Sequence, residues 1–163
     1  MFNKFLSILI SSLFVSSALL GSPGTNDRAP EIQLPFVDGS SESIAKVYPG
    51  ETHTVLEFSA YACKWCRLGM PTLNDLAQRL VGKATVKIIT PDSKEKSKKF
   101  LQELGINLPT AYDVDFLAFD AYGVTLTPHT FVIDQSGLIV FTHQDKELTQ
   151  EVADHIYNIV NGN

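Results

Sequence analysis

The chain has 163 residues, of which 44% are hydrophobic and 19% charged. This balance is typical of a globular domain with a short extension and excludes a disordered chain. The formal net charge of −5 argues against nucleic-acid binding, because such binding depends on positive side chains that neutralise phosphates.

The first 22 residues predict a signal peptide or an N-terminal membrane anchor. Lys4 supplies a positive charge, and the apolar run that follows is closed by small residues. This order is typical of a secretory signal, and the run is nearly long enough to span a bilayer uncleaved. Residues 23–30, rich in Gly, Pro, Asn and Asp, predict a linker, and we expect one domain over residues 31–163.

The first half of that domain contains strand signals and then a helix signal. Apolar residues alternate with polar ones over residues 32–36, before a turn signal at Asp38-Gly39, and predict an N-terminal strand or hairpin. Residues 54–58 form a short apolar run that predicts a central strand. Residues 68–80 carry apolar side chains at helical spacing and predict a helix.

The second half continues the alternation. Asp92 and Glu95 form a capping-box pattern that predicts a helix with Asp92 as its N-cap. The remaining predicted elements are strands at 85–90, 108–112, 130–134 and 138–143, a short helix at 115–122, and a last helix that buries Val152, Ile156, Ile159 and Val160. Alternating strands and helices predict a layered α/β domain with a partly parallel sheet, and the closing hairpin adds an antiparallel edge.

The only two cysteines, Cys63 and Cys66, stand three positions apart. A bridge between them closes too short a loop to constrain the unfolded chain, so reactivity explains the pair better than stability. Between the predicted strand and helix, Cys63 sits at a helix N-terminus, where unpaired N–H groups favour a reactive thiolate. Lys64 and Arg67 add positive charge. Cys66, one turn further, can attack a mixed disulfide and release the product.

Two other uses of the cysteines stay open. The pair could form an inert structural disulfide. It could also complete a metal site with two histidines, although none of the four is spaced as a ligand pair on one element: His53, His129, His143 and His155. We therefore predict no metal and no organic cofactor.

Glu57 lies inside the predicted central strand. Burial disfavours its charge and raises the pKa of a carboxyl group. Glu57 could then exchange a proton near neutral pH as Cys66 changes state. The alternative is a carboxylate that reaches water or pairs with a lysine such as Lys87.

The segment from residue 55 to 67, which contains Cys63-Lys64-Trp65-Cys66, resembles the active-site segment of thioredoxins. Pro71 falls where thioredoxins kink the active-site helix, and the run from Thr127-Pro128 to Gly137 resembles their cis-proline loop and hairpin. Ala29-Pro30 and the stretch at 108–124 resemble the secreted TlpA and ResA-like branch. The resemblance implies a thioredoxin-like fold: a central mixed sheet flanked by helices, an N-terminal hairpin, and a strand–helix insertion before the cis-proline.

The resemblance also implies roles for individual residues. Cys63 is the nucleophile, Cys66 its resolving partner, and Glu57 a buried acid beneath the dithiol. Pro128 is cis, and Thr127 presents its backbone to an extended substrate segment. The chain departs from the family at Ala62, where tryptophan is usual, and at Lys64-Trp65, which lacks the common proline. Trp65 then replaces the lost aromatic surface or packs against the partner protein, and the reduction potential stays open.

The resulting prediction is an exported thiol–disulfide oxidoreductase in the periplasm or at the outer face of the cytoplasmic membrane. Its partners are protein substrates with cysteine pairs and a membrane or periplasmic redox protein. Reduction, as in cytochrome c maturation, is favoured because the branch it resembles is largely reductive. The alternatives are an oxidant and a copper-delivery protein. Peroxidase chemistry is disfavoured, because peroxiredoxins need a proline and a Thr or Ser where Ser59 and Ala60 stand.

Overall fold

The structure is a computed structural model that describes residues 22–45 and 52–162. The predicted signal or anchor, residues 1–22, lies outside the described residues except for Ser22. Among the residues that are described, no helix has the length and apolar character needed to cross a bilayer.

Strands and helices alternate along the chain, as the sequence predicts. Their order is β1 (Gln33–Pro35), β2 (Ser41–Ser43), β3 (His53–Phe58), α1 (Lys64–Arg79), β4 (Ala84–Thr90), α2 (Lys94–Leu104), β5 (Thr110–Tyr112), α3 (Leu117–Ala121), β6 (His129–Ile133), β7 (Ile139–His143) and α4 (Gln150–Asn161).

The central sheet has the strand order β5-β4-β3-β6-β7. Strands β3, β4 and β5 run parallel, whereas β6 is antiparallel to β3 and β7 is antiparallel to β6. The predicted mixed sheet with an antiparallel edge is therefore confirmed. Strands β1 and β2 form the predicted N-terminal hairpin, which meets β5 through a bridge between Phe36 and Ala111.

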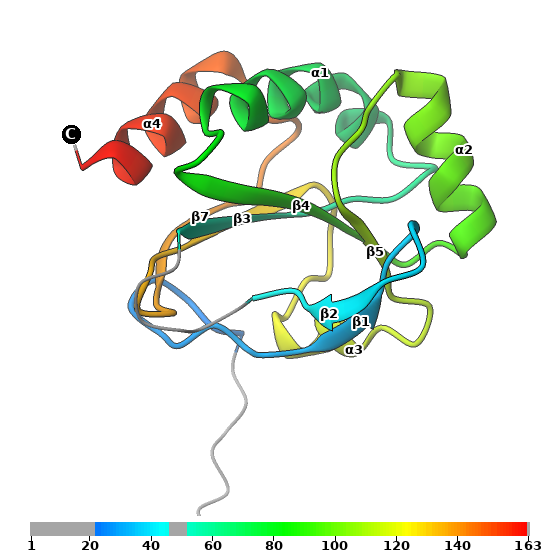
Figure 1. Cartoon of the computed structure of the whole chain (residues 1–163), viewed down its shortest axis with the longest axis horizontal. Helices are drawn as coiled ribbons and strands as arrows, with labels where there is room; N and C mark the ends of the chain where they lie inside the picture. The colour runs from blue at the N-terminus through cyan, green and yellow to red at the C-terminus, as the bar shows by residue number, and fades with distance from the viewer. Residues whose placement is uncertain (1–21, 46–51, 163) are drawn as a thin grey trace, which may run out of the picture.

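The sheet has a helical layer on each face. Helices α1, α2 and α4 cover one face, and α3 lies with the β1–β2 hairpin on the other (Figure 1). Successive side chains of a strand point to opposite faces. Val55 therefore packs with the core beneath α1 and α4, and Leu56 and Phe58 pack with the core beneath α3. By the same alternation Glu57 lies on the α1 face.

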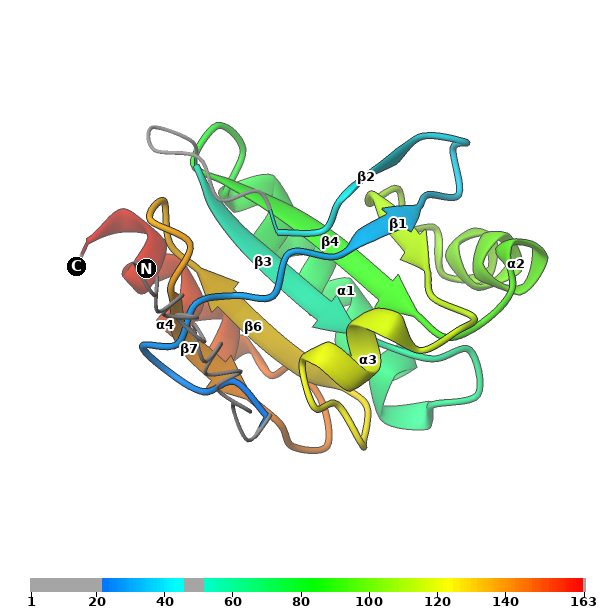
Figure 2. The same cartoon turned by 90° about the horizontal axis from the view of Figure 1, so that it is seen from below.

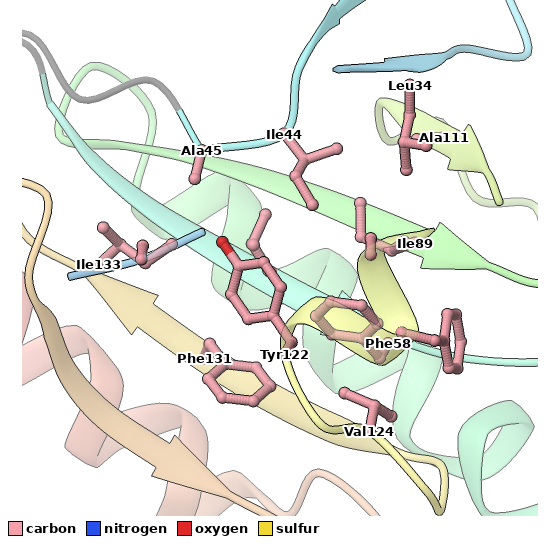
Figure 3. Close-up of a cluster of buried hydrophobic side chains, with 14 of the residues drawn as sticks. Leu34, Ile44, Ala45, Phe58, Ile89, Ala111, Tyr122, Val124, Phe131 and Ile133 are labelled. Atoms are coloured by element: carbon pink, nitrogen blue, oxygen red, sulfur yellow. The ribbon is translucent and has the colours of Figure 1, made fainter. Parts of the chain in front are cut away.

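Tyr122 is the centre of the core beneath α3 (Figure 3). Its ring centroid lies 5.2 Å from that of Phe58 and 5.1 Å from that of Phe131. Its hydroxyl donates a hydrogen bond of 2.9 Å to the carbonyl of Pro30. Burial raises the pKa of Tyr122, which keeps the hydroxyl a donor. The contact fastens the start of the domain to α3.

The stretch at residues 23–30 runs along the β6–β7 turn. The backbone N–H of Asn26 donates to the carbonyl of Ile139 at 2.8 Å, and that of Ala29 donates to Gly137 at 2.9 Å. Ala29 is buried in the core beneath α3. These contacts hold the stretch against the domain over its last residues.

Three details differ from the sequence-based expectation. Helix α1 begins at Lys64, four residues before the apolar periodicity that starts at residue 68. Helix α2 takes Ser93, not Asp92, as its N-cap, because the Ser93 hydroxyl accepts from the N–H of Lys96. In α4 it is Ala153, Ile156 and Val160 that are buried, while Val152 and Ile159 are only partly so.

Candidate active site

Several loops meet at one edge of the sheet. Parallel strands end at the same edge, so the loops that follow β3, β4 and β5 lie together there. Strand β6 is antiparallel and starts at this edge, with its first residue His129 opposite Phe58 at the end of β3. We call it the dithiol edge, because Cys63 and Cys66 follow β3.

Cys63 and Cys66 form a disulfide bond, with 5.3 Å between their Cα atoms. Cys63 is the N-cap of α1, and its Sγ atom lies 3.0 Å from the backbone nitrogen of Cys66 and accepts its hydrogen bond. The predicted position of Cys63 at a helix N-terminus is confirmed. Cys63 is half-buried, whereas Cys66 is 1% exposed. An incoming sulfur therefore reaches Cys63 first, and the N-terminal dipole of α1 favours its thiolate.

Asp92 fixes the loop that leads to the disulfide. Its carboxylate accepts a hydrogen bond of 2.6 Å from the backbone N–H of Tyr61 and one of 3.0 Å from the hydroxyl of Thr90. The side chain that the sequence assigns to capping α2 is thus engaged across the sheet edge. It ties the active-site loop to the end of β4.

The peptide bond between Thr127 and Pro128 is cis, as expected. The carbonyl oxygen of Thr127 lies 3.5 Å from Sγ of Cys63. The structure therefore brings the predicted nucleophile together with Thr127, the residue before the cis-proline.

A groove of about 420 Å³ opens beside this loop. Its lining combines one of the two residues between the cysteines, the proline loop and the loop after β7: Trp65, Leu126, Thr127, Pro128, Gln144, Asp145 and Lys146. Because the carbonyl oxygen of Thr127 lies 3.5 Å from Sγ of Cys63, the groove opens next to the outer sulfur of the disulfide.

Two lysines supply positive charge at the groove. Nζ of Lys64 lies 5.1 Å from the ring centroid of Trp65, and Nζ of Lys146 lies 5.8 Å from it. The guanidinium of Arg67, predicted to act in the same way, pairs instead with Glu103 at 2.8 Å. The sequence offers no local signal for Lys146, because only the path of the chain after β7 places it here.

Glu57 is 2% exposed and lies in the centre of the sheet. Thr130 donates a hydrogen bond of 2.6 Å to its Oε2 atom. Burial raises the pKa of Glu57 from 4.5 to about 7, although the Thr130 hydrogen bond acts in the opposite direction. The alternative pairing with Lys87 is wrong, because Lys87 lies opposite Leu56 in the register and its Nζ contacts the carbonyl of Ser43 beneath the hairpin.

His129 follows the cis-proline but does not form a ligand group. Its Nε2 atom lies 2.8 Å from the hydroxyl of Thr142, and its ring stacks on Phe131 at 4.3 Å. Burial, with a smaller effect of His143, lowers the pKa of His129 to about 4. Within residues 22–45 and 52–162, no group of three or more His, Cys, Asp or Glu side chains could hold a metal ion.

The cysteine pair lies at a strand-to-helix junction of a thioredoxin-like sheet, and a cis-proline loop lies against its outer sulfur. This arrangement defines a thiol–disulfide oxidoreductase. The model of the AhpC/TSA family matches residues 25–142. The chain belongs to this family.

The names of the relatives fall into two groups, thiol–disulfide oxidoreductases and a peroxiredoxin. The thiol-disulfide oxidoreductase ResA of Geobacillus thermodenitrificans is 26% identical over 133 residues, which cover 80% of this chain and 75% of ResA. A Mycobacterium tuberculosis protein whose name places it among the peroxiredoxins is 30% identical over 145 residues, which cover 81% of this chain and 90% of the relative.

A solved structure shows the same fold. The thioredoxin domain of a thiol-disulfide oxidoreductase from Bacteroides vulgatus superposes with a TM-score of 0.75 at 21% identity, and the match covers 86% of this chain and all of that one. The extent of this match confirms the predicted thioredoxin-like architecture.

Proposed function

We propose that this oxidoreductase is exported and reduces disulfide bonds in protein substrates. The observation that carries the proposal is the half-buried Cys63 at the N-terminus of α1, 3.5 Å from the Thr127 carbonyl and beside an open groove. The groove accepts an extended polypeptide, and only the outer of the two sulfurs is within reach of it.

The reaction starts from the reduced dithiol. The Cys63 thiolate attacks one sulfur of the substrate disulfide, forms a mixed disulfide, and releases the other substrate sulfur as a thiolate. Cys66 then loses its proton and attacks Sγ of Cys63, which releases the second substrate thiolate and closes the Cys63–Cys66 disulfide. Two electrons pass from the enzyme to the substrate, and a redox partner must return them.

Glu57 is the proposed acceptor of the proton from Cys66. Both residues are buried, and Glu57 lies on the face of the sheet that α1 covers. With a pKa of about 7, its carboxyl group can hold or release a proton under neutral conditions. Thr127, Pro128 and Trp65 are the proposed contacts for the substrate chain, since all three line the groove.

The positive start and apolar run before residue 22 support export to the periplasm or to the outer face of the cytoplasmic membrane. Fractionation of cells that express the full chain tests this part of the proposal. Recovery in the cytoplasm would contradict it.

The reduction potential measured against glutathione tests the direction of transfer. A value well below the glutathione couple supports a reductant, and one well above it supports an oxidant. The same preparation should reduce insulin, and Cys63→Ser should abolish that activity.

A peroxidase is the second candidate, because the name of one relative, 30% identical over 145 residues, places that relative among the peroxiredoxins. Reduced enzyme mixed with hydrogen peroxide separates the two. Rapid peroxide consumption that depends on Cys63, with no insulin reduction, would favour the peroxidase.

A further inference from the structure

The exposed apolar side chains gather at the dithiol edge. In the part of the chain that the structure describes, seven large apolar side chains are exposed: Trp65, Leu68, Val81, Val114, Phe116, Leu117 and Leu126. Six belong to the first turns of α1 or to the loops around β5, α3 and β6 that meet at this edge. Val81, beyond the far end of α1, is the exception. Exposed apolar groups concentrated in one region mark an interaction surface.

Three of these residues form what we call the apolar ledge: Val114, Phe116 and Leu117. The ledge follows β5 and opens α3, which lies beside the end of β3 (Figure 2). Phe116 has a φ of 58°, in the left-handed region that bulky residues rarely adopt. Its side chain is nevertheless 48% exposed. Core packing therefore does not account for this conformation.

The side chain of Asp113 holds the backbone around Phe116 in this conformation. Its carboxylate is buried and accepts hydrogen bonds of 2.9, 2.9 and 3.1 Å from the backbone N–H groups of three successive residues: Leu117, Ala118 and Phe119. The N–H of Asp113 itself donates to the carbonyl of Thr90 at 2.7 Å. The loop is thus fixed to β4, and the strain at Phe116 is held in place rather than relieved.

An aromatic series connects the ledge to the base of the active site. The ring of Phe116 lies 5.7 Å from that of Phe119, which lies 5.1 Å from that of Phe58 at the end of β3. Leu126, 69% exposed, lines the groove together with Thr127, whose carbonyl oxygen lies 3.5 Å from Sγ of Cys63. The ledge and the disulfide therefore lie at the same edge of the sheet, after β5 and β3 respectively.

We propose that the apolar ledge docks the protein substrate, by holding an apolar segment that flanks the substrate cysteine. The inference rests on the proposed function. A protein whose cysteine reaches Cys63 must cover this edge, whereas a small disulfide needs only the groove. Asp115 is exposed between the ledge residues, and its negative charge repels acidic groups. The substrate segment that binds here therefore carries apolar side chains and no acidic cluster.

The test compares a protein disulfide with a small one. Phe116→Asn keeps a residue that tolerates a positive φ but removes the apolar ring. We expect kcat/KM for insulin to fall about tenfold, mainly through KM, as for loss of an interface anchor. The rate with glutathione disulfide stays unchanged. Val81→Asn, which removes the exposed apolar side chain far from this edge, should alter neither rate.

An equal loss with both disulfides, or no loss with insulin, would overturn the ledge as a docking surface while the oxidoreductase activity stands. Failure of the wild-type enzyme to reduce either disulfide would instead overturn the proposed function. Circular dichroism of each variant checks that the fold is retained.

Discussion

The hydroxyl of Thr130 donates a hydrogen bond of 2.6 Å to the carboxyl group of Glu57 in the middle of the sheet. This bond favours the charged form of the acid, and burial opposes it more strongly. The balance leaves Glu57 with a pKa near neutrality, where small changes in its surroundings alter its protonation. Three predictions follow from this pair.

The first concerns stability with the disulfide intact. The pKa of Glu57 rises from 4.5 in the unfolded chain to about 7 in the fold. The protonated fold is therefore favoured at low pH, and stability falls as pH rises from about 4.5 to about 7, by about 3 kcal/mol. Glu57→Gln removes this dependence. Denaturant unfolding of both proteins from pH 4 to pH 8 measures it, and parallel curves would contradict the buried acid.

The second concerns Thr130→Val, which removes the hydrogen bond that lowers the pKa of Glu57. The pKa should rise further above its ordinary value. Carbon-13 NMR of the Glu57 carboxyl group measures the midpoint. Thr142→Val, on the exposed side of β7, is the matched control and should leave that midpoint in place.

The third concerns catalysis. Glu57→Gln cannot accept a proton from Cys66, so insulin reduction between pH 6 and pH 8 should slow by about tenfold or more. The fold should survive, because the substitution keeps the shape of the side chain. Glu31→Gln, at an exposed position, serves as the control. A rate that is unchanged across this pH range would refute a proton-transfer role.

A fourth prediction separates the two cysteines. In Cys66→Ser the mixed disulfide between Cys63 and a substrate cannot resolve, so covalent adducts should accumulate and be visible on a non-reducing gel. Cys63→Ser leaves only a thiol that is 1% exposed in the oxidised fold, and adducts should be absent. Equal trapping by both variants would exclude Cys63 as the entry point.

A fifth prediction concerns the packing of the active-site helix. A Cβ atom at Gly69 would lie 2.8 Å from the backbone nitrogen of Leu148. Gly69→Ala should therefore destabilise the fold by about 1–3 kcal/mol, despite the better helix propensity of alanine. Thermal unfolding measures the loss. Gln78→Ala, exposed on the same helix, should change stability by less than about 0.5 kcal/mol.

Sequence patterns predicted the order of strands and helices along the chain and the position of Cys63 at a helix N-terminus, because each depends on signals within a few residues. The alternation of these elements also predicted the mixed sheet. The apolar periodicity marks α1 only from residue 68, because the first turn of the helix, which begins at Lys64, has no such pattern. Asp92 and Ser93 are both good N-caps, and only the contact of Asp92 with Tyr61 decides between them.

The rest of the site depends on tertiary contacts. Thr130 reaches Glu57 only because β6 pairs with β3, and Lys146 reaches Trp65 only through the path of the chain after β7. Phe116 is exposed because Asp113 dictates the backbone around it. None of these relationships has a signal within the local sequence.

Trp65 is the single tryptophan of the chain, and it stands between the two cysteines with its ring on the groove. Tryptophan emission from this protein therefore comes from one indole beside the reacting sulfurs. Disulfide formation, or a peptide entering the groove, changes the surroundings of that indole directly. The molecule thus carries an intrinsic optical reporter, through which turnover can be followed without any label.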